Sequence, residues 1–414
     1  MVIKFQNNRF KLFFLVFYIS LIAGFIFNEN STGGAIVDYI NQKKAVNDFA
    51  NNFLLTFLNY ENYGTRHSPV LIIGLSFLEK FGFNDIGVRL IHLHLSLILP
   101  FLFIKILKLK FDFKNKEMVY IISFLVFLSP TYRTLSIWPD SRLFGLIFFC
   151  ISIIYYLKFI NHQKKKYCIL NILFYSVSSY ISPNFSVFSI FFFYKYFLYF
   201  KNDFNFLIKI ILVNLILALP AFYYVFILDV NFINQPAAVG FDKKSIFLDN
   251  IFNNILLISS IILFYLIPFM QTKIISLEKF ELHYSILLIL AIIFTSIYYF
   301  NYSYAYTGGG IFYKASYFFF KNNIIFYIIS STSLYMIYLL CRNNKSNLLI
   351  FLCLLISNPQ ITVYHKYYDP LLVILFFSLF DFRVDINKKS TKKYIYIYGY
   401  FIIFLLLSII KTNV

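Results

Sequence analysis

Apolar runs recur along the whole chain and are separated by short polar segments. Many runs extend for roughly 17 to 25 residues, which is the length a helix needs to cross a hydrocarbon core about 30 Å thick. The runs are solid apolar blocks rather than the alternating pattern of a membrane barrel. A backbone in lipid must satisfy its own hydrogen bonds, so the pattern predicts an all-α, polytopic transmembrane helical bundle.

We assign thirteen apolar runs as spans and expect 12–13 crossings. They cover residues 12–27, 86–106, 118–130, 142–158, 167–182, 184–200, 204–228, 250–270, 284–300, 322–340, 347–357, 369–381 and 394–410. The run at 69–83 is short and contains Glu79 and Lys80, so we expect a juxtamembrane or partly inserted helix there. The first run resembles a signal peptide, but no convincing small-residue cleavage site follows it, and we expect a retained span.

Composition and charge agree with this interpretation. Hydrophobic residues make up 60% of the chain and charged residues 13%, whereas a soluble domain has about 25% charged residues. The 37 Lys and Arg residues outnumber the 18 Asp and Glu residues and cluster at 105–116, 158–166, 342–345 and 383–393. Such clusters mark cytoplasmic loops, so the N-terminus is predicted in the cytoplasm and 28–67 outside. Membrane lipids account for the basic excess, and no nucleic acid partner is expected.

No repeat, soluble domain or Gly/Ser linker interrupts the chain, so we expect a single integral membrane domain over 1–414. Within it, 1–200 would form one module and 201–414 would add further helices. The four cysteines have no CxxC spacing, which indicates neither a disulfide framework nor a zinc site. Glycines 308–310 lack the Lys-Ser/Thr of a nucleotide loop, so we expect a flexible loop there.

The first outside segment contains a candidate general base. Gly33 and Gly34 allow a sharp turn before Asp38, and a carboxylate at the membrane surface can deprotonate a hydroxyl. Alternatively, Asp38 only caps a helix that starts near Tyr39. Residues 42–59 have apolar positions at mostly helical spacing, which predicts an amphipathic interfacial helix. These positions are Ala45, Val46, Phe49, Phe53, Phe57 and Leu58.

Basic residues on the outside supply candidate phosphate ligands. Arg66 and His67 suit a phosphate oxygen through charge-assisted hydrogen bonds, or they face lipid headgroups without a specific partner. In the loop at 129–142, Asp140 and Arg142 either neutralise each other or, beside Arg133, form a polar pocket. The only tryptophan, Trp138, is expected to be an interfacial anchor.

A second polar and aromatic cluster lies at 358–370, between two apolar runs. Polar groups close to a membrane interior are costly and therefore suggest function. His365 and Lys366 would clamp a phosphate, and Tyr364 and its neighbours would stack on sugar rings or line a lipid groove. The alternative is an ordinary loop with a tyrosine belt.

The order of these motifs resembles the GT-C superfamily of integral membrane glycosyltransferases, particularly the bacterial branch that includes protein mannosyltransferases and the lipid A aminoarabinose transferase. The resemblance rests on Asp38 after the first span, Arg66-His67-Ser68-Pro69, Phe81-Gly82 followed by Arg89, Asp140, and the motif at 358–370.

The resemblance implies an inverting glycosyltransferase of the bacterial inner (plasma) membrane. Its donor would be a polyprenyl-phosphate-linked sugar, and its acceptor a glycan, a lipid-linked saccharide or a protein. By the same resemblance Asp38 would be the catalytic base. The substrate-binding residues would be Arg66, His67, Arg133, Asp140, Arg142, Tyr364, His365 and Lys366. The resemblance fixes no cofactor and leaves a divalent metal open. Tyr39 follows Asp38 where relatives often have a second acid, so a divalent metal is not indicated.

Two other functions fit a chain of this type. A transporter or flippase of lipid-linked saccharides would have a similar number of spans, but it would place ionisable residues near the membrane midplane. A polymerase of saccharide repeats would share the donor chemistry and carry a large, arginine-rich late loop. The segment 301–321 is short and poor in arginine.

Overall fold

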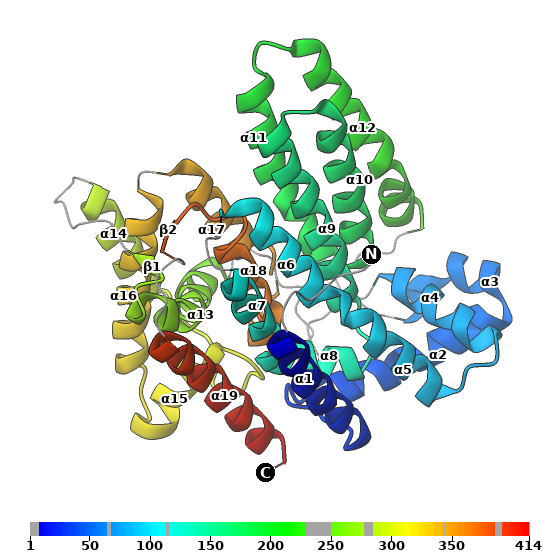
Figure 1. Cartoon of the computed structure of the whole chain (residues 1–414), viewed down its shortest axis with the longest axis horizontal. Helices are drawn as coiled ribbons and strands as arrows, with labels where there is room; N and C mark the ends of the chain where they lie inside the picture. The colour runs from blue at the N-terminus through cyan, green and yellow to red at the C-terminus, as the bar shows by residue number, and fades with distance from the viewer. Residues whose placement is uncertain are drawn as a thin grey trace. The chain divides into compact units, whose positions relative to one another are not determined.

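A computed structural model describes residues 8–63, 68–112, 116–228, 250–276, 285–342, 344–358, 360–385 and 391–413. Helices dominate these residues (Figure 1). The strands in the described part are β1 (Ile275–Ser276) and β2 (Arg383–Val384), an antiparallel pair in which Ile275 lies opposite Val384. The predicted all-α fold is therefore confirmed.

The chain divides into two compact units, which we describe separately. The first unit comprises Met1–Tyr63, Ser68–Ser182 and Ile386–Val414, and the second comprises Gly64–His67 and Pro183–Asp385. This boundary differs from the division at residue 200 suggested by the sequence. Whether the whole chain acts as one membrane domain stays a prediction.

The first unit contains the N-terminal helices and the last helix of the chain. Its elements are α1 (Asn8–Ile26), α2 (Ala35–Asn51), α3 (Phe53–Leu58), η1 (Tyr60–Tyr63), α4 (Pro69–Lys80), α5 (Asp85–Ser96), α6 (Ile98–Lys110), α7 (Lys116–Phe124), η2 (Leu125–Leu128), α8 (Pro130–Ile137), α9 (Ser141–His162), α10 (Lys165–Ile181) and α19 (Thr391–Asn413).

The second unit contains the remaining helices and both strands. Its helices are η3 (Pro183–Phe188), α11 (Ser189–Phe200), α12 (Phe204–Phe222), η4 (Tyr223–Ile227), α13 (Ile251–Gln271), α14 (Ser285–Tyr298), α15 (Gly310–Phe320), α16 (Ile324–Cys341), α17 (Lys345–Ile356), η6 (His365–Tyr367) and α18 (Leu371–Phe376).

Several helices of the first unit begin at residues whose side chains cap them. Ser68 accepts a hydrogen bond from the Val70 backbone amide, and Ser129 accepts one from the amide of Tyr132. Each serine is followed by a proline at the first helical position, where the missing amide hydrogen costs nothing. The chain therefore sets the starts of α4 and α8 locally.

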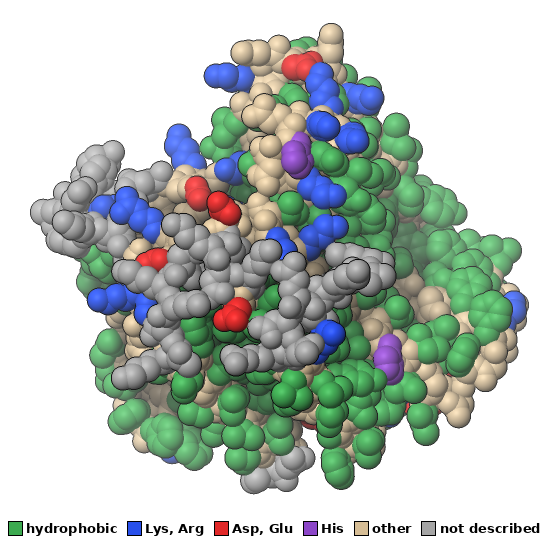
Figure 2. All heavy atoms as spheres, in the orientation of Figure 1, with side chains coloured by type: hydrophobic (Ala, Val, Ile, Leu, Met, Phe, Trp, Pro, Cys, Tyr) green, Lys and Arg blue, Asp and Glu red, His purple; other side chains and the backbone are tan. Residues whose placement is uncertain are grey.

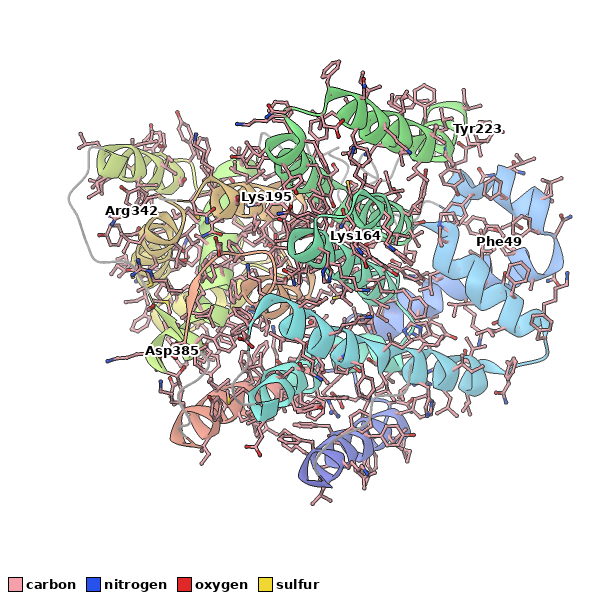
Figure 3. All side chains as sticks on the ribbon, turned by 45° about the horizontal axis from the view of Figure 1, so that its top comes forward. Phe49, Lys164, Lys195, Tyr223, Arg342 and Asp385 are labelled. Atoms are coloured by element: carbon pink, nitrogen blue, oxygen red, sulfur yellow. The ribbon has the colours of Figure 1, made fainter. Side chains whose placement is uncertain are left out.

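Polar contacts lock α9 against α10, which lie side by side (Figure 1). The Asn171 amide donates to the Ser152 carbonyl and hydroxyl oxygens at 2.9 and 2.8 Å, and the Ser178 hydroxyl donates to the Gly145 carbonyl at 2.8 Å. Small residues let helices approach closely, and polar side chains join them across an apolar interface. Figure 3 labels Lys164 at the turn between the two helices.

The described residues contain six helices long and apolar enough to cross a membrane. They are Asp85–Lys110, Ser141–His162, Phe204–Ile227, Ile251–Gln271, Ile324–Cys341 and Lys393–Thr412. The bent pair Glu117–Leu128 and Pro130–Ile137, with an angle of 65°, makes seven if it is one span. Many large apolar side chains are exposed, and Figure 2 shows wide hydrophobic areas on the visible face. The chain is an integral membrane protein.

The other predicted spans correspond to shorter helices. The run at 12–27 matches α1, whose apolar part is Phe10–Ile26. The run at 369–381 is wrong as a continuous helical span, because α18 ends at Phe376. The amides of Ser378, Leu379 and Phe380 all donate to the Leu375 carbonyl, so the chain turns there instead of continuing.

The predicted amphipathic helix at 42–59 is two helices rather than one. The backbone leaves the helical region at Asn52, which ends α2 and caps α3 by accepting from the Leu55 amide. Ahead of this break the prediction holds, since Phe49 is 2% exposed and packs within the group of helices α2 to α4 (Figure 3). After it Phe53 and Leu58 are exposed, because the break rotates them away from the core.

Candidate functional site

Asp38 lies inside α2, in its first turn, and does not cap it. The helix begins at Ala35, and Gly34 occupies the capping position without a side-chain hydrogen bond. Gly33 adopts a φ of +80°, a conformation that side chains rarely adopt, so glycine suits the turn that leads into the helix. The alternative that Asp38 only caps a helix starting near Tyr39 is therefore wrong.

The guanidinium of Arg142 joins Asp38 to Asp140. Arg142 Nη2 lies 3.4 Å from Asp38 Oδ2 and 2.6 Å from Asp140 Oδ2, and Arg142 Nε donates to Asp140 Oδ1 at 2.9 Å. The side chain of Asp140 is only 2% exposed, that of Arg142 13%, and that of Asp38 32%. The guanidinium of Arg142 thus lies between the buried carboxylate of Asp140 and the partly exposed carboxylate of Asp38.

The start of α9 fixes this arrangement. Asp140 is the N-cap of α9, and its Oδ1 also accepts a hydrogen bond from the backbone amide of Arg142 at 2.7 Å. A two-point contact between guanidinium and carboxylate holds both side chains in one plane. Asp140 therefore orients Arg142, and Arg142 in turn orients Asp38.

A second polar contact anchors α2 against the start of α5. The Tyr39 hydroxyl donates to Asp85 Oδ1 at 2.8 Å, and Lys43 Nζ lies 3.0 Å from the same oxygen. Burial and the hydrogen bond to Asp85 raise the pKa of Tyr39, so its hydroxyl stays a donor at neutral pH. This contact fixes the rotation of α2 about its own axis, and Asp38 lies one residue before Tyr39.

Arg133 takes part in a different contact from the one proposed for it. It forms a buried ion pair with Glu29, in which Arg133 Nε donates to Oε1 at 2.8 Å and Nη2 donates to Oε2 at 2.5 Å. It also donates to the hydroxyl and carbonyl oxygens of Ser20. Because these contacts occupy most of its donors, Arg133 is poorly suited to bind a phosphate. Sequence reasoning missed Glu29, whose only signal was an acid directly after the first apolar run.

Trp138 is buried rather than placed as an interfacial anchor. It is 7% exposed, and its Nε1 donates to the Glu29 carbonyl at 3.0 Å. The guanidinium carbon of Arg89 lies 3.5 Å from the centre of the indole ring. A cation over an aromatic face is stabilised by the negative face of the ring, and more so away from water. The anchor prediction was wrong because burial and the partner of the indole N–H depend on contacts distant in sequence.

In the second unit, the predicted residues at 364–366 lie on and beside η6. His365 Nδ1 lies 3.2 Å from the hydroxyl of the buried Tyr265, and the His365 ring packs edge-on against Phe264. Lys366 Nζ lies 5.2 Å from the centre of the Tyr364 ring. All three predicted residues are partly exposed. They form a cationic and aromatic surface within this unit.

The glycine run at 308–310 packs closely against the same segment instead of forming a loose loop. The Gly309 amide donates to the Val363 carbonyl at 2.7 Å, and the Thr307 hydroxyl lies 2.7 Å from that of Tyr364. A Cβ added at Gly308 would lie 2.6 Å from the Val363 oxygen, and its φ of +146° disfavours any side chain. The glycines therefore let two loops meet at backbone distance.

Two predicted residues and the predicted absence of an indicated metal have yet to be compared with the structure. Arg66 and His67 lie outside the described residues. Within the described part of the chain, no three His, Cys, Asp or Glu residues are grouped to hold a metal ion. The carboxylates of Asp38 and Asp140 share a guanidinium instead, whose charge opposes a divalent cation between them.

No protein-family model matches the chain, and no curated protein or solved structure shows significant similarity to it. The site is therefore interpreted from its own geometry.

Proposed function

We propose that this protein is an inverting glycosyltransferase that moves a sugar from a polyprenyl-phosphate donor to a glycan, a lipid-linked saccharide or a protein. The observation that supports this most strongly is the contact of Asp38 with Arg142, which Asp140 holds in turn. It couples a partly exposed carboxylate after the first apolar helix to a buried, charged support. A general base needs this combination of access and fixed orientation.

In the proposed reaction, Asp38 accepts the proton of the acceptor hydroxyl while the hydroxyl oxygen attacks the anomeric carbon of the donor. The bond between that carbon and the phosphate oxygen breaks, and its electron pair leaves with the phosphate. Attack from the face opposite the phosphate inverts the anomeric configuration. Arg142 and Asp140 hold the carboxylate in place, so orientation is established before the reaction.

The leaving phosphate needs positive charge beside it. Arg66, His67, Tyr364, His365 and Lys366 are the proposed donors of charge and hydrogen bonds to it. Fixed cations that face developing negative charge are an effective source of transition-state stabilisation. Arg133 is withdrawn from this group because its guanidinium is held by Glu29 and Ser20.

The proposal also includes a topology. The N-terminus lies in the cytoplasm of a bacterial cell, the chain crosses the inner membrane several times, and α2 to α4 lie beside its outer surface. The basic clusters of the sequence support this orientation. The donor would then meet Asp38 from the outer leaflet.

A transfer assay tests the function. The purified protein in proteoliposomes is supplied with a panel of polyprenyl-phosphate sugars and glycan acceptors, and NMR determines the anomeric configuration of any product. We expect transfer with at least one donor and inversion at the anomeric carbon. Retention of configuration would rule out the mechanism, and movement of lipid-linked saccharide across the bilayer without any product would instead identify a transporter.

A further inference from the structure

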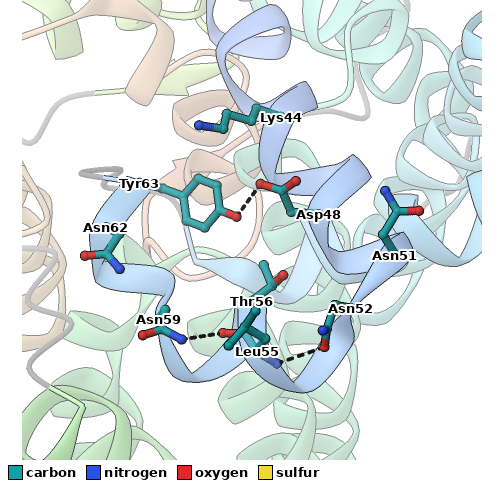
Figure 4. Close-up of a pocket in the computed structure, with 9 residues that line it drawn as sticks. All are labelled: Lys44, Asp48, Asn51, Asn52, Leu55, Thr56, Asn59, Asn62 and Tyr63. Carbon is teal, nitrogen blue, oxygen red and sulfur yellow. Dashed lines mark hydrogen bonds between the residues drawn. The ribbon is translucent and has the colours of Figure 1, made fainter.

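A polar pocket opens between α2, α3 and η1 of the first unit (Figure 4). Its volume is about 480 Å³, within the range of roughly 300–1,000 Å³ found for small-molecule sites. The lining residues are Lys44, Asp48, Asn51, Asn52, Leu55, Thr56, Asn59, Asn62 and Tyr63.

Most residues that line this pocket are polar in type, although carbon atoms make up most of the surface they expose to it. Leu55 is the only aliphatic residue among the nine, and four of the others are asparagines. An asparagine amide offers a donor and an acceptor side by side, which matches two adjacent hydroxyl groups on one molecule. The four asparagines therefore favour a ligand rich in hydroxyls, whose C–H groups can pack on the apolar part of the surface.

Hydrogen bonds give the pocket a defined shape. The Tyr63 hydroxyl donates to Asp48 Oδ2 at 2.6 Å and ties η1 to α2 (Figure 4). Burial and this hydrogen bond raise the pKa of Tyr63 to about 12, so the donor persists at physiological pH. Asn59 Nδ2 donates to the Leu55 carbonyl at 2.9 Å, while Asn52 Oδ1 accepts from the Leu55 amide. Each of these asparagines keeps its other amide atom for a ligand.

The charges of the pocket select against anions. Lys44 and Asp48 lie one helical turn apart on the same face of α2, and their formal charges cancel. A phosphate would face the carboxylate of Asp48 with no surplus of positive charge. The ligand that fits this balance is neutral or carries both signs of charge.

The pocket is separate from the environment of Asp38. Along α2, Asp48 lies about 15 Å from Asp38, and the two positions are about 80° apart round the helix axis. A hydroxyl that reacts at Asp38 therefore does not sit in the pocket. A longer acceptor would place a different sugar unit there.

We propose that this pocket binds a neutral saccharide unit of the acceptor, remote from the hydroxyl that is glycosylated. The acceptor role rests on the proposed function, whereas saccharide binding itself does not. The unit belongs either to a soluble glycan or to the headgroup of a glycolipid, since both present the same hydroxyls.

Saturation-transfer NMR tests the proposal on the full-length protein in nanodiscs. Preparation must avoid alkyl-glycoside detergents, because their sugar headgroups would compete. The probes are methyl glycosides of hexoses and N-acetylhexosamines, and a second arm uses a long-chain alkyl glycoside inserted in the nanodisc. We expect saturation transfer to at least one sugar ring. Transfer in both arms indicates a soluble ligand, and transfer in the second arm alone indicates a glycolipid.

Single substitutions locate the binding. Asn51→Ala and Asn62→Ala should each reduce the transferred signal at least about fivefold, since each removes a pair of hydrogen-bonding atoms from the lining. Asn47→Ala is the matched control, because Asn47 is an exposed asparagine of α2 outside the pocket, and the signal should not change. No signal in either arm, or a signal that Asn51→Ala and Asn62→Ala leave intact, would overturn the proposal.

The outcome is distinguishable from that of the proposed function. Asp38→Asn should retain saccharide binding while it loses transfer. If the protein binds saccharide in the pocket but has no transferase activity, the binding proposal is supported and the proposed function is wrong. If the protein transfers sugar and Asn51→Ala leaves the KM for the acceptor unchanged, the proposed function is supported and the pocket is not an acceptor site.

Discussion

At the scale of single residues, the guanidinium of Arg142 contacts two carboxylates that differ in exposure. Asp140 holds it by a two-point contact, and Asp38 meets it at 3.4 Å. The stronger contact is with the buried partner, where water competes least. Asp38 is thereby oriented by Arg142 while its carboxylate remains partly open to an acceptor.

The first prediction concerns this orientation. Arg142→Met should reduce kcat for transfer by about 10²-fold. Without the guanidinium Asp38 is no longer held in place, and a displacement of a reacting group by about 1 Å has an effect of this size. Arg142→Lys should recover only part of the loss, since a lysine cannot bind a carboxylate at two points. Steady-state kinetics on the purified variants measure both. Arg383→Met, at an exposed arginine of β2, should retain full activity. Unaltered kcat in Arg142→Met would show that Asp38 needs no such support.

Part of this site could be predicted from the sequence, and part could not. Glycines before Asp38 and an acid at the mouth of a later apolar run were visible as patterns. That Arg142 contacts Asp38 was not, because 104 residues separate the two. Arg133 illustrates the opposite error, since its neighbours in sequence suggested a pocket, and its actual partner is Glu29.

At the scale of elements, the glycine run at 308–310 is joined through its backbone to the tyrosine-rich segment at 358–370 of the same unit. Gly309 bonds to Val363, and Tyr302 accepts a hydrogen bond from the Val363 amide. This contact holds the start of α15 beside η6, and it explains why glycines rather than any small residues occupy 308–310. The sequence indicated a loop there but not its neighbour.

The second prediction tests this contact. Gly308→Ala should destabilise the protein by about 2 kcal/mol or more, because the new Cβ meets the Val363 oxygen and the backbone lies in a strained region. Gly74→Ala is the control, since nothing lies within 4 Å of its added Cβ and alanine favours the interior of α4. Thermal unfolding in detergent compares them. Equal melting temperatures for Gly308→Ala and the wild type would contradict the contact.

Span boundaries were the least predictable feature of the elements. Hydropathy located the long helices Ser141–His162 and Ile251–Gln271 well, because each is a single uninterrupted apolar run. It joined Leu371–Phe376 to the residues that follow, although the backbone turns after Leu375. Apolar composition is shared by both segments, and the hydrogen bonds that separate them are not encoded in hydropathy.

At the scale of the whole molecule, the proposed topology requires α2 and the turn between α9 and α10 to lie on opposite sides of the membrane. The third prediction is that Asn47→Cys reacts with a membrane-impermeant maleimide in intact cells. Lys164→Cys should react only after permeabilisation. Both positions are exposed, and the four native cysteines are buried, so background labelling is expected to be low. Labelling of Lys164→Cys in intact cells would contradict the proposed topology.

The most direct test of the central claim is the rate of a single turnover by Asp38→Asn. The substitution preserves size and removes the basic carboxylate, so the transfer rate should fall by about 10² or more, the usual contribution of a general base. Binding of the polyprenyl-phosphate donor should persist. Asp112→Asn, at an exposed acid after α6, should turn over like the wild type. If Asp38→Asn transfers sugar at the wild-type rate, Asp38 is not the base.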